Sequence, residues 1–264
     1  MMILSAVCLL LLGGIALGGW CWQEEALAVD FSRKNLAPNA EYLFGTDWLG
    51  RDMFLRTLAG LSMSIRLGLL TATVSAGIAL ALGLLAAMGR TADLVVSGLI
   101  DLVMGIPHML LLILISCACQ KGFAGVAAGI SLTHWPSLAR LIRGEVFQLR
   151  ESPYIRIAGK LGKSRAYLAF HHMAPNLLPQ FIPGLILMFP HAILHEASIT
   201  FLGFGLSPEE PAIGIILSES MKYLAMGKWW LALFPGLLLT AVVLMFHYAG
   251  QTICRMAAPG SVHE

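Results

Sequence analysis

Two histidines stand four residues apart in an apolar stretch in the last third of the chain. His191 and His195 are separated by one helical turn, so their imidazoles share a helix face, and Met188 lies on that face as well. Imidazole and thioether groups suit late first-row ions such as Ni²⁺ or copper, and suit Mg²⁺ or Ca²⁺ poorly. The pattern predicts transient metal contacts at His191 and His195. Hydrogen bonding of both histidines across a helix interface is the alternative.

Two patterns that resemble catalytic or nucleotide-binding motifs are incomplete. His195-Glu196 begins like the zinc-protease pattern H-E-x-x-H, but position 199 is Ile199. Gly162-Lys163-Ser164 ends like a P-loop, but the glycine required five residues earlier is Ile157. The chain also has no Gly-x-Ser-x-Gly elbow. We therefore expect no bond chemistry and no ATP binding by this chain alone.

The composition excludes most soluble classes. Of 264 residues, 58% are hydrophobic and only 12% are charged, whereas soluble domains are about half apolar and about a quarter charged. The net charge of +2 is too small to attract nucleic acid, and five cysteines form no disulfide framework. These numbers predict a polytopic membrane protein.

Six stretches are long and apolar enough to be spanning helices. They are Met2–Trp20, Ile65–Met88, Leu94–Cys119, Phe123–Leu141, Leu177–Phe204 and Trp229–Gly250. The first has no basic residue before it and no clear cleavage site after it, so we expect a retained helix rather than a signal peptide. The prediction is an all-α polytopic fold with about six transmembrane helices in one domain, residues 1–264.

Basic residues set the orientation. The segment from Arg140 to Arg165 carries seven Lys or Arg and only two acidic residues, which predicts that this loop is cytoplasmic. Both termini are then cytoplasmic, residues 145–176 form a cytoplasmic loop, and residues 21–64 are extracytoplasmic. Within residues 21–64, Asp47 and Asp52 are candidates for capping the next helix.

Ionisable residues inside apolar stretches are costly and usually face a cavity or a partner. Asp93 is expected at the cytoplasmic surface, and Asp101 in a pair with another chain. His108 follows Pro107 and fits either a translocation path or a packing role. The predicted substrate path consists of Met188, His191, His195, Glu196 and His108.

The cytoplasmic loop has the pattern of two short helices joined at a glycine. Ser152-Pro153 is a good helix start, and Gly162 can supply a left-handed stop. Ser164 can cap a second helix, which should end before Pro175. Tyr154, Ile155, Ala158 and Leu161 form the apolar face of the first helix.

The sequence resembles the permeases of binding-protein-dependent ABC importers in three ordered elements. Residues Glu151–Asn176 are similar to the EAA loop, Phe44–Asp52 to the GTD-x-x-GRD element of the peptide/nickel subfamily, and Glu196–Leu206 to its E-A-x-L-S-F-L-G-L-G segment. Nickel permeases of this subfamily resemble the chain at His191, His195 and His134-Trp135. Within the EAA signature, Arg156-Ile157-Ala158 departs from the usual acidic residue and first alanine.

The resemblance implies a permease subunit that imports nickel or a nickel chelate across the bacterial cytoplasmic (inner) membrane. It implies a second permease subunit, two ATPase subunits that carry ATP and Mg²⁺, an extracytoplasmic substrate-binding protein and surrounding lipid as partners. No cofactor of its own and no nucleic acid are expected. The residues implied to couple the chain to the ATPase are Glu151, Pro153, Tyr154, Ala158, Gly162 and Ser164.

Two alternatives remain open from the sequence. The cargo could be di- or oligopeptides, in which case the pair His191 and His195 would be structural. The chain could instead be a self-sufficient secondary transporter driven by Asp101, Glu196 and the histidines, a class that often shows internal inverted repeats.

Overall fold

The structure is a computed structural model that describes residues 2–257, and the regular elements in that range are helices. In chain order they are α1 (Met2–Cys21), α2 (Gln23–Leu27), the 3₁₀ turn η1 (Phe31–Arg33), α3 (Met53–Ala86), α4 (Arg90–Gly105), α5 (His108–Ala118), α6 (Gly122–Glu151), α7 (Pro153–Lys160), α8 (Arg165–Tyr167), the π-helical turn η2 (Leu168–Met173), α9 (Ala174–Phe201), α10 (Ile213–Leu224) and α11 (Trp230–Ala257). The predicted all-α fold is confirmed.

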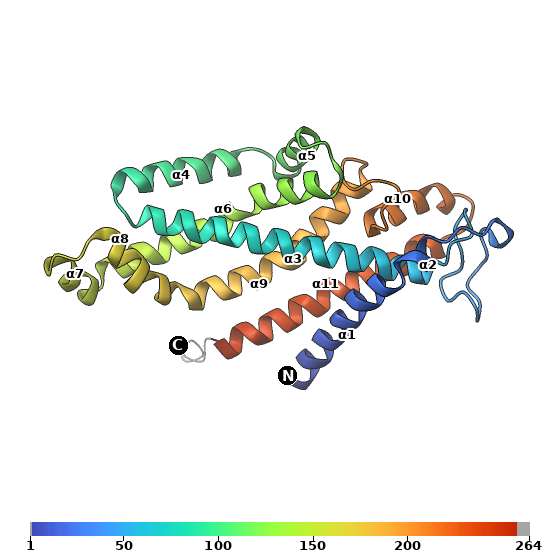
Figure 1. Ribbon diagram of the computed structural model, residues 1–264, viewed down its shortest axis with the longest axis horizontal. Coiled ribbons are helices and arrows are strands. Elements are labelled where there is room, and N and C mark those ends of the chain that lie inside the picture. The colour runs from blue at the N-terminus through green and yellow to red at the C-terminus, as the bar shows by residue number, and fades with distance from the viewer. Residues whose placement is uncertain (1, 258–264) are drawn as a thin grey trace.

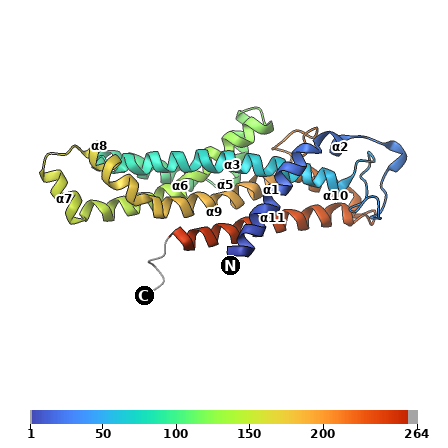
Figure 2. The ribbon, with the colours of Figure 1, turned by 60° about the horizontal axis from the view of Figure 1, so that its bottom comes forward.

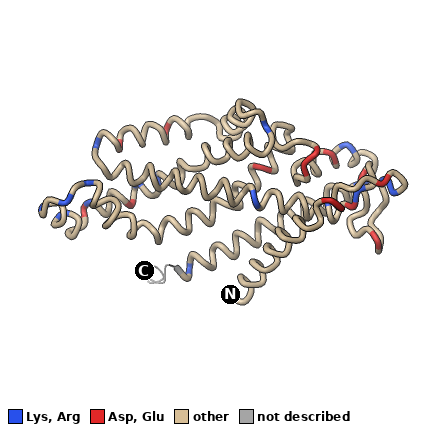
Figure 3. The backbone as a smooth tube through the Cα atoms, in the orientation of Figure 1, with Lys and Arg blue, Asp and Glu red and all other residues tan. Residues whose placement is uncertain are grey.

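The long helices run along one axis of an elongated molecule. α3, α6, α9 and α11 extend along its length, with α7 and α8 at one end and α10 with residues 28–52 at the other (Figures 1 and 2). Charged residues gather at these two ends and are sparse between them (Figure 3). This distribution is typical of helices that cross an apolar layer.

Four helices are long and apolar enough to span a membrane by themselves. They are Met2–Cys21, Met53–Ala86, Arg165–Phe201 and Trp230–Met256, and the bent pair α4 and α5 makes a possible fifth. α6, which contains the predicted fourth span, does not qualify, because its first half includes His134, Pro136 and several Gly and Ser residues and its second half carries three arginines. α6 nevertheless packs along α3, α5 and α9 within the bundle.

The predicted third span is not one straight helix. α4 ends at Gly105, α5 begins at His108, and their axes are bent by 95°. Pro107 has no backbone N–H and holds Ile106 in an extended conformation, with φ −93° and ψ 137°. The helix must therefore stop at this point, and the break puts His108 at the start of α5.

Two acidic residues of α4 pair with arginines of α6. Asp93 accepts a hydrogen bond from Arg143, with 3.1 Å between Oδ2 and Nη2. Asp101 Oδ1 lies 2.8 Å from Arg140 Nη2. Asp101 therefore has a partner in its own chain. Arg140 and Arg143 lie about one turn apart on α6, and the two carboxylates that they pair with lie about two turns apart on α4.

α3 begins well before the predicted second span because its N-terminus is capped. The Asp52 carboxylate accepts hydrogen bonds from the backbone N–H groups of Phe54 and Leu55, which confirms one predicted cap. Asp47, the other candidate, does not cap the helix. Its Oδ1 accepts from the N–H groups of Leu49 and Arg51 and so closes the turn that leads to α3.

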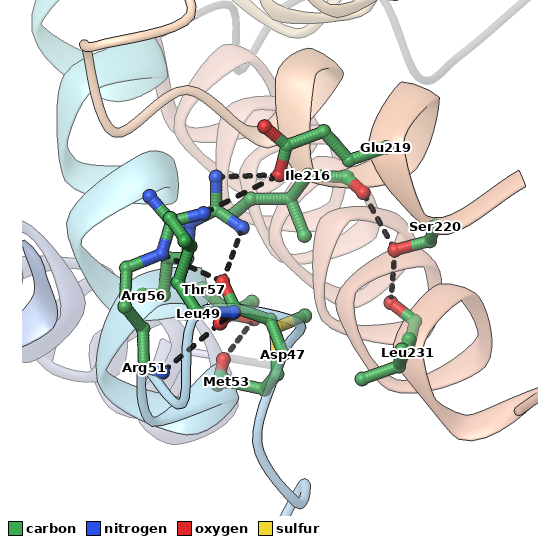
Figure 4. Close-up of polar contacts among 10 residues, drawn as sticks. All are labelled: Asp47, Leu49, Arg51, Met53, Arg56, Thr57, Ile216, Glu219, Ser220 and Leu231. Carbon is green, nitrogen blue, oxygen red and sulfur yellow. Dashed lines mark hydrogen bonds and ion pairs between the residues drawn. The ribbon is translucent and has the colours of Figure 1, made fainter. Parts of the chain in front are cut away.

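A buried ion-pair network joins this turn to α3 and α10 (Figure 4). Asp47 Oδ2 lies 2.6 Å from Arg51 Nε and 3.0 Å from Arg56 Nη1, and Arg56 Nη2 lies 2.8 Å from Glu219 Oε2. The side chain of Arg56 is only 2% exposed. The network holds residues 28–52 against the helix bundle, and the sequence analysis did not anticipate it.

Replacing Arg56 with glutamine should destabilise the protein, because Asp47 and Glu219 would lose a buried counter-charge. We expect a loss of about 3 kcal/mol in the free energy of unfolding, as is typical when one partner of a buried ion pair is removed. Thermal unfolding of the purified chain measures the effect. The control is Arg33→Gln, which removes a half-exposed pair with Asp30 and should cost less than about 1 kcal/mol. Equal unfolding curves for Arg56→Gln and the native chain would contradict the assigned role.

Candidate functional site

A cavity lies between the α4–α5 break, α6 and α9. Its volume is about 770 Å³, and most of its lining is apolar. The polar lining side chains are Thr133, Ser137, His108, His134, His191 and His195. Four of the six are therefore imidazoles, and neither an acidic residue nor a lysine or arginine lines the cavity.

Three of these histidines meet in one cluster. The ring centroids of His108, His134 and His195 lie 4.6 to 4.9 Å apart, and one nitrogen of each ring lies within 4.8 Å of the others. The rings come from the start of α5, the middle of α6 and the middle of α9. The residues of the cluster are far apart in sequence, so their spacing could not reveal it.

The predicted pair of His191 and His195 is divided by the structure. Both residues line the cavity, but only His195 belongs to the cluster. His191 is exposed on the cavity wall, and Met188 lines the same wall below it. His134, which only the family resemblance singled out, takes the place beside His195 that the sequence assigned to His191.

Glu196 lies outside the cavity, which corrects its predicted place in the substrate path. Its side chain is fully buried and accepts hydrogen bonds from Ser64 of α3 and from Thr200, the latter at 3.1 Å. Because Glu196 directly follows His195 on α9, the two side chains point about 100° apart. The structure therefore gives this carboxyl a role in joining α3 to α9.

Residues 145–176, which the sequence predicts to be a cytoplasmic loop, include the projection formed by α7 and α8 at one end of the molecule (Figure 1). Pro153 is the first residue of α7, as predicted. Of the predicted apolar face, only Ile155 is buried and Ala158 partly so, whereas Tyr154 is 42% and Leu161 is 77% exposed. The exposed side of α7 also carries Ile157, which is 58% exposed. α7 thus presents an apolar surface that the described residues 2–257 do not cover.

The caps of the loop differ from the prediction at one end. Ser164 caps α8 by accepting from the Tyr167 N–H at 3.2 Å, as expected. Ser152 does not cap α7, because its hydroxyl donates to the Leu149 carbonyl instead. Glu151 is exposed and pairs with Arg156 at 3.0 Å.

Gly162 ends the first short helix in the left-handed conformation, with φ +84°. A Cβ atom at this position would meet no other atom within 4 Å. The requirement for glycine therefore comes from the backbone angle and not from lack of space.

The second short helix does not stop before Pro175. α8 passes through the π-helical turn η2 into α9, so that Arg165–Phe201 forms one continuous helical span. Pro175 is the second residue of α9, directly after this π turn, where its missing backbone N–H is tolerated. Motion of the projection can therefore pass directly into α9, which lines the cavity.

The family is shown by comparison with known proteins. A family model described as the binding-protein-dependent transport system inner membrane component matches residues 79–252, which include the cavity-lining residues and the projection of α7 and α8. The chain belongs to this family. It is a permease subunit of an ABC importer, and this membership excludes the self-sufficient secondary transporter.

Relatives of this permease are named for peptide transport. It is 32% identical over 243 residues to a putative peptide transport system permease protein of Brucella suis, covering 92% of this chain and 82% of that protein. It is 34% identical over 221 residues to the dipeptide transport system permease protein DppC of Alkalihalophilus pseudofirmus, covering 83% and 72%.

The fold of this permease matches that of a solved importer. The inward-facing MetNI methionine ABC transporter superimposes with a TM-score of 0.62 at 18% sequence identity, over 78% of this chain and 97% of the matched chain. The similarity supports the helix arrangement described above.

Replacing Glu196 with alanine should loosen the contact between α3 and α9. The Ser64 hydroxyl would lose its buried acceptor, and an unsatisfied buried polar group costs about 1–3 kcal/mol. Thermal unfolding of the permease measures the loss, with Glu209→Ala as the control because Glu209 is exposed. If Glu196→Ala unfolds like Glu209→Ala, the carboxyl does not stabilise this interface.

Proposed function

We propose that this permease subunit forms half of the membrane pathway of a di- or oligopeptide importer. The observation that carries the proposal is the set of relatives at 32–34% identity named for peptide and dipeptide transport. These names favour a peptide over the nickel ion or nickel chelate that the sequence analysis expected as cargo.

The cavity is consistent with a cargo of peptide size. About 770 Å³ falls in the range of about 300–1,000 Å³ that pockets for small organic molecules occupy, and it far exceeds the space that a bare ion needs. The lining is mostly apolar with a few polar groups. Such a surface tolerates different side chains while it holds the polar backbone of a peptide weakly.

We infer that energy reaches the cavity from partner subunits through α7. Tyr154, Ile157 and Leu161 give this short helix an exposed apolar surface at the basic end of the molecule (Figure 3), which suits insertion into a groove of another protein. ATP and Mg²⁺ would bind on two separate ATPase subunits in the cytoplasm. The continuous helix from Arg165 to Phe201 would carry their movement to the cavity.

The remaining partners follow from the half-open pathway. The cavity is bounded by α4, α5, α6 and α9 of this chain on one side, and we propose that a second permease subunit closes the other side. A substrate-binding protein would deliver cargo at the end that carries α10 and residues 28–52. This arrangement places both termini and α7 in the cytoplasm of a bacterium.

A charge on the tip of α7 should uncouple transport. Leu161→Glu places a carboxylate on the exposed apolar surface, and burying it against an ATPase would be costly. We expect the ATPase to be lost on purification of the complex and uptake to fall about ten-fold or more, while the permease still inserts into the membrane.

The matched control is Met226→Glu, which makes the same change on a side chain 68% exposed at the opposite end of the molecule. It should retain the ATPase. Retention of the ATPase by Leu161→Glu would rule out docking through α7.

The cargo can be tested by uptake in a strain that lacks its other peptide and nickel importers. Expression of this permease with its neighbouring subunits should restore uptake of radiolabelled di- to pentapeptides. Uptake of ⁶³Ni²⁺ with no uptake of any labelled peptide would refute the peptide proposal. Leu161→Glu serves as the inactive control in the same cells.

A further inference from the structure

Three imidazoles from three different helices converge on one wall of the transport cavity. His108 begins α5, His134 lies in α6 and His195 lies in α9. One nitrogen of each lies within 4.8 Å of the others. Tertiary packing alone brings the three rings together, because even His108 and His134, the two nearest in sequence, lie on different helices.

The hydrogen bonds of His134 leave one nitrogen available as a ligand. Its Nδ1 lies 3.0 Å from the carbonyl oxygen of Ile130, so Nδ1 must carry the proton and donate it. Nε2 then has a free lone pair, and it is buried without a hydrogen-bond partner. A backbone acceptor that orients the second nitrogen in this way is typical of metal-binding histidines.

The other two rings are arranged similarly. His108 Nε2 is also buried and has no hydrogen-bond partner. His195 Nδ1 lies 3.2 Å from the Met109 sulfur. Because a thioether sulfur accepts hydrogen bonds but does not donate them, Nδ1 carries the proton and the lone pair is on Nε2. Buried polar atoms are normally paired, so two orphaned nitrogens in one cluster point to a missing ligand.

The surroundings of the cluster select the ligand class. Three neutral imidazoles suit Ni²⁺, Cu²⁺ or Zn²⁺ and do not suit Mg²⁺ or Ca²⁺. Among the residues that the structure describes, no carboxylate lines the cavity to balance the charge of a divalent ion. The balancing group must therefore come from outside the chain, and a peptide supplies one in its terminal carboxylate.

We propose that His108, His134 and His195 bind one divalent transition-metal ion, with at least one coordination position open to the cavity and filled by a donor group of the cargo. That a donor group of the cargo fills the open position rests on the proposed peptide function, whereas the three-histidine site does not. Three protein ligands with an open position also characterise metal centres that exchange a fourth ligand. The importer would then carry peptides as metal complexes or hold them through a metal.

Small movements of the side chains complete the site. Tetrahedral bonds of about 2.0–2.1 Å require ligand nitrogens about 3.4 Å apart, so the rings must approach one another by about an ångström. His108 stands at the first residue of α5, where the 95° break provides room for adjustment. His191 lines the same cavity but lies outside the cluster, which makes it a matched control.

Metal binding to the full-length chain, purified in nanodiscs with its co-purifying subunits, tests the site. Equilibrium dialysis against Ni²⁺ and, separately, Zn²⁺ should show one ion bound per chain. His134→Gln and His195→Gln should each weaken binding on the order of 100-fold, whereas His191→Gln should stay close to the native affinity. Unchanged binding by His134→Gln and His195→Gln, or equal loss with His191→Gln, would overturn the proposal.

X-ray absorption of the ion on the native chain decides the question even if the variants fold poorly. We expect three imidazole nitrogens at about 2.0–2.1 Å. A shell made of oxygen ligands alone would overturn the site. Adding a dipeptide should alter the visible spectrum of the bound Ni²⁺, and an unchanged spectrum would overturn the proposal that the cargo supplies a ligand to the ion.

The outcome is separable from that of the peptide proposal. One ion bound by the three histidines in a chain that transports no labelled peptide would refute the proposed cargo and retain the metal site. Peptide uptake by a chain that binds no ion at the cluster would refute the metal site and retain the peptide function.

Discussion

α3 lies close to α6 and α9 because its inward face carries glycine, alanine and serine in place of larger side chains. A Cβ atom on Gly83 would lie 2.4 Å from Ile142 of α6, and one on Gly68 would lie 3.0 Å from Ile193 of α9. Lipid gives helices little hydrophobic reason to associate, so close packing and interhelical hydrogen bonds must supply the attraction. The Ser75 hydroxyl, which donates to the Ser131 carbonyl at 3.0 Å, and the Ser64–Glu196 contact are two such bonds.

This tight centre leaves the cavity to one side of it. α6 and α9 are held by α3, and α4 is held to α6 by paired arginines and aspartates. The 95° break at Pro107 turns α5 away from the axis of α4, and the residues of this break line the cavity. Pro107 prevents α4 and α5 from forming one straight helix, and the break that it makes places His108 in the cavity wall.

The two ends of the molecule differ in how firmly they are held. At one end the pairs that Asp47, Arg56 and Glu219 form are largely buried and fix the segment before α3. At the other, α7 buries little more than Ile155 and presents apolar side chains outward. The continuous helix from Arg165 to Phe201 connects that uncovered surface with the cavity.

Local sequence determined the helical class, most of the apolar stretches, the Asp52 and Ser164 caps and the glycine at position 162, because hydropathy, capping and backbone angles depend on neighbouring residues. Tertiary structure alone decided which histidines meet, since His108, His134 and His195 belong to three helices whose relative rotation no local pattern encodes. It likewise decided that Glu196 faces Ser64 and that Glu219 pairs with Arg56. The sequence pointed to His191 beside His195 because one turn of a helix is a local spacing, whereas the contacts of a bundle depend on how its helices pack.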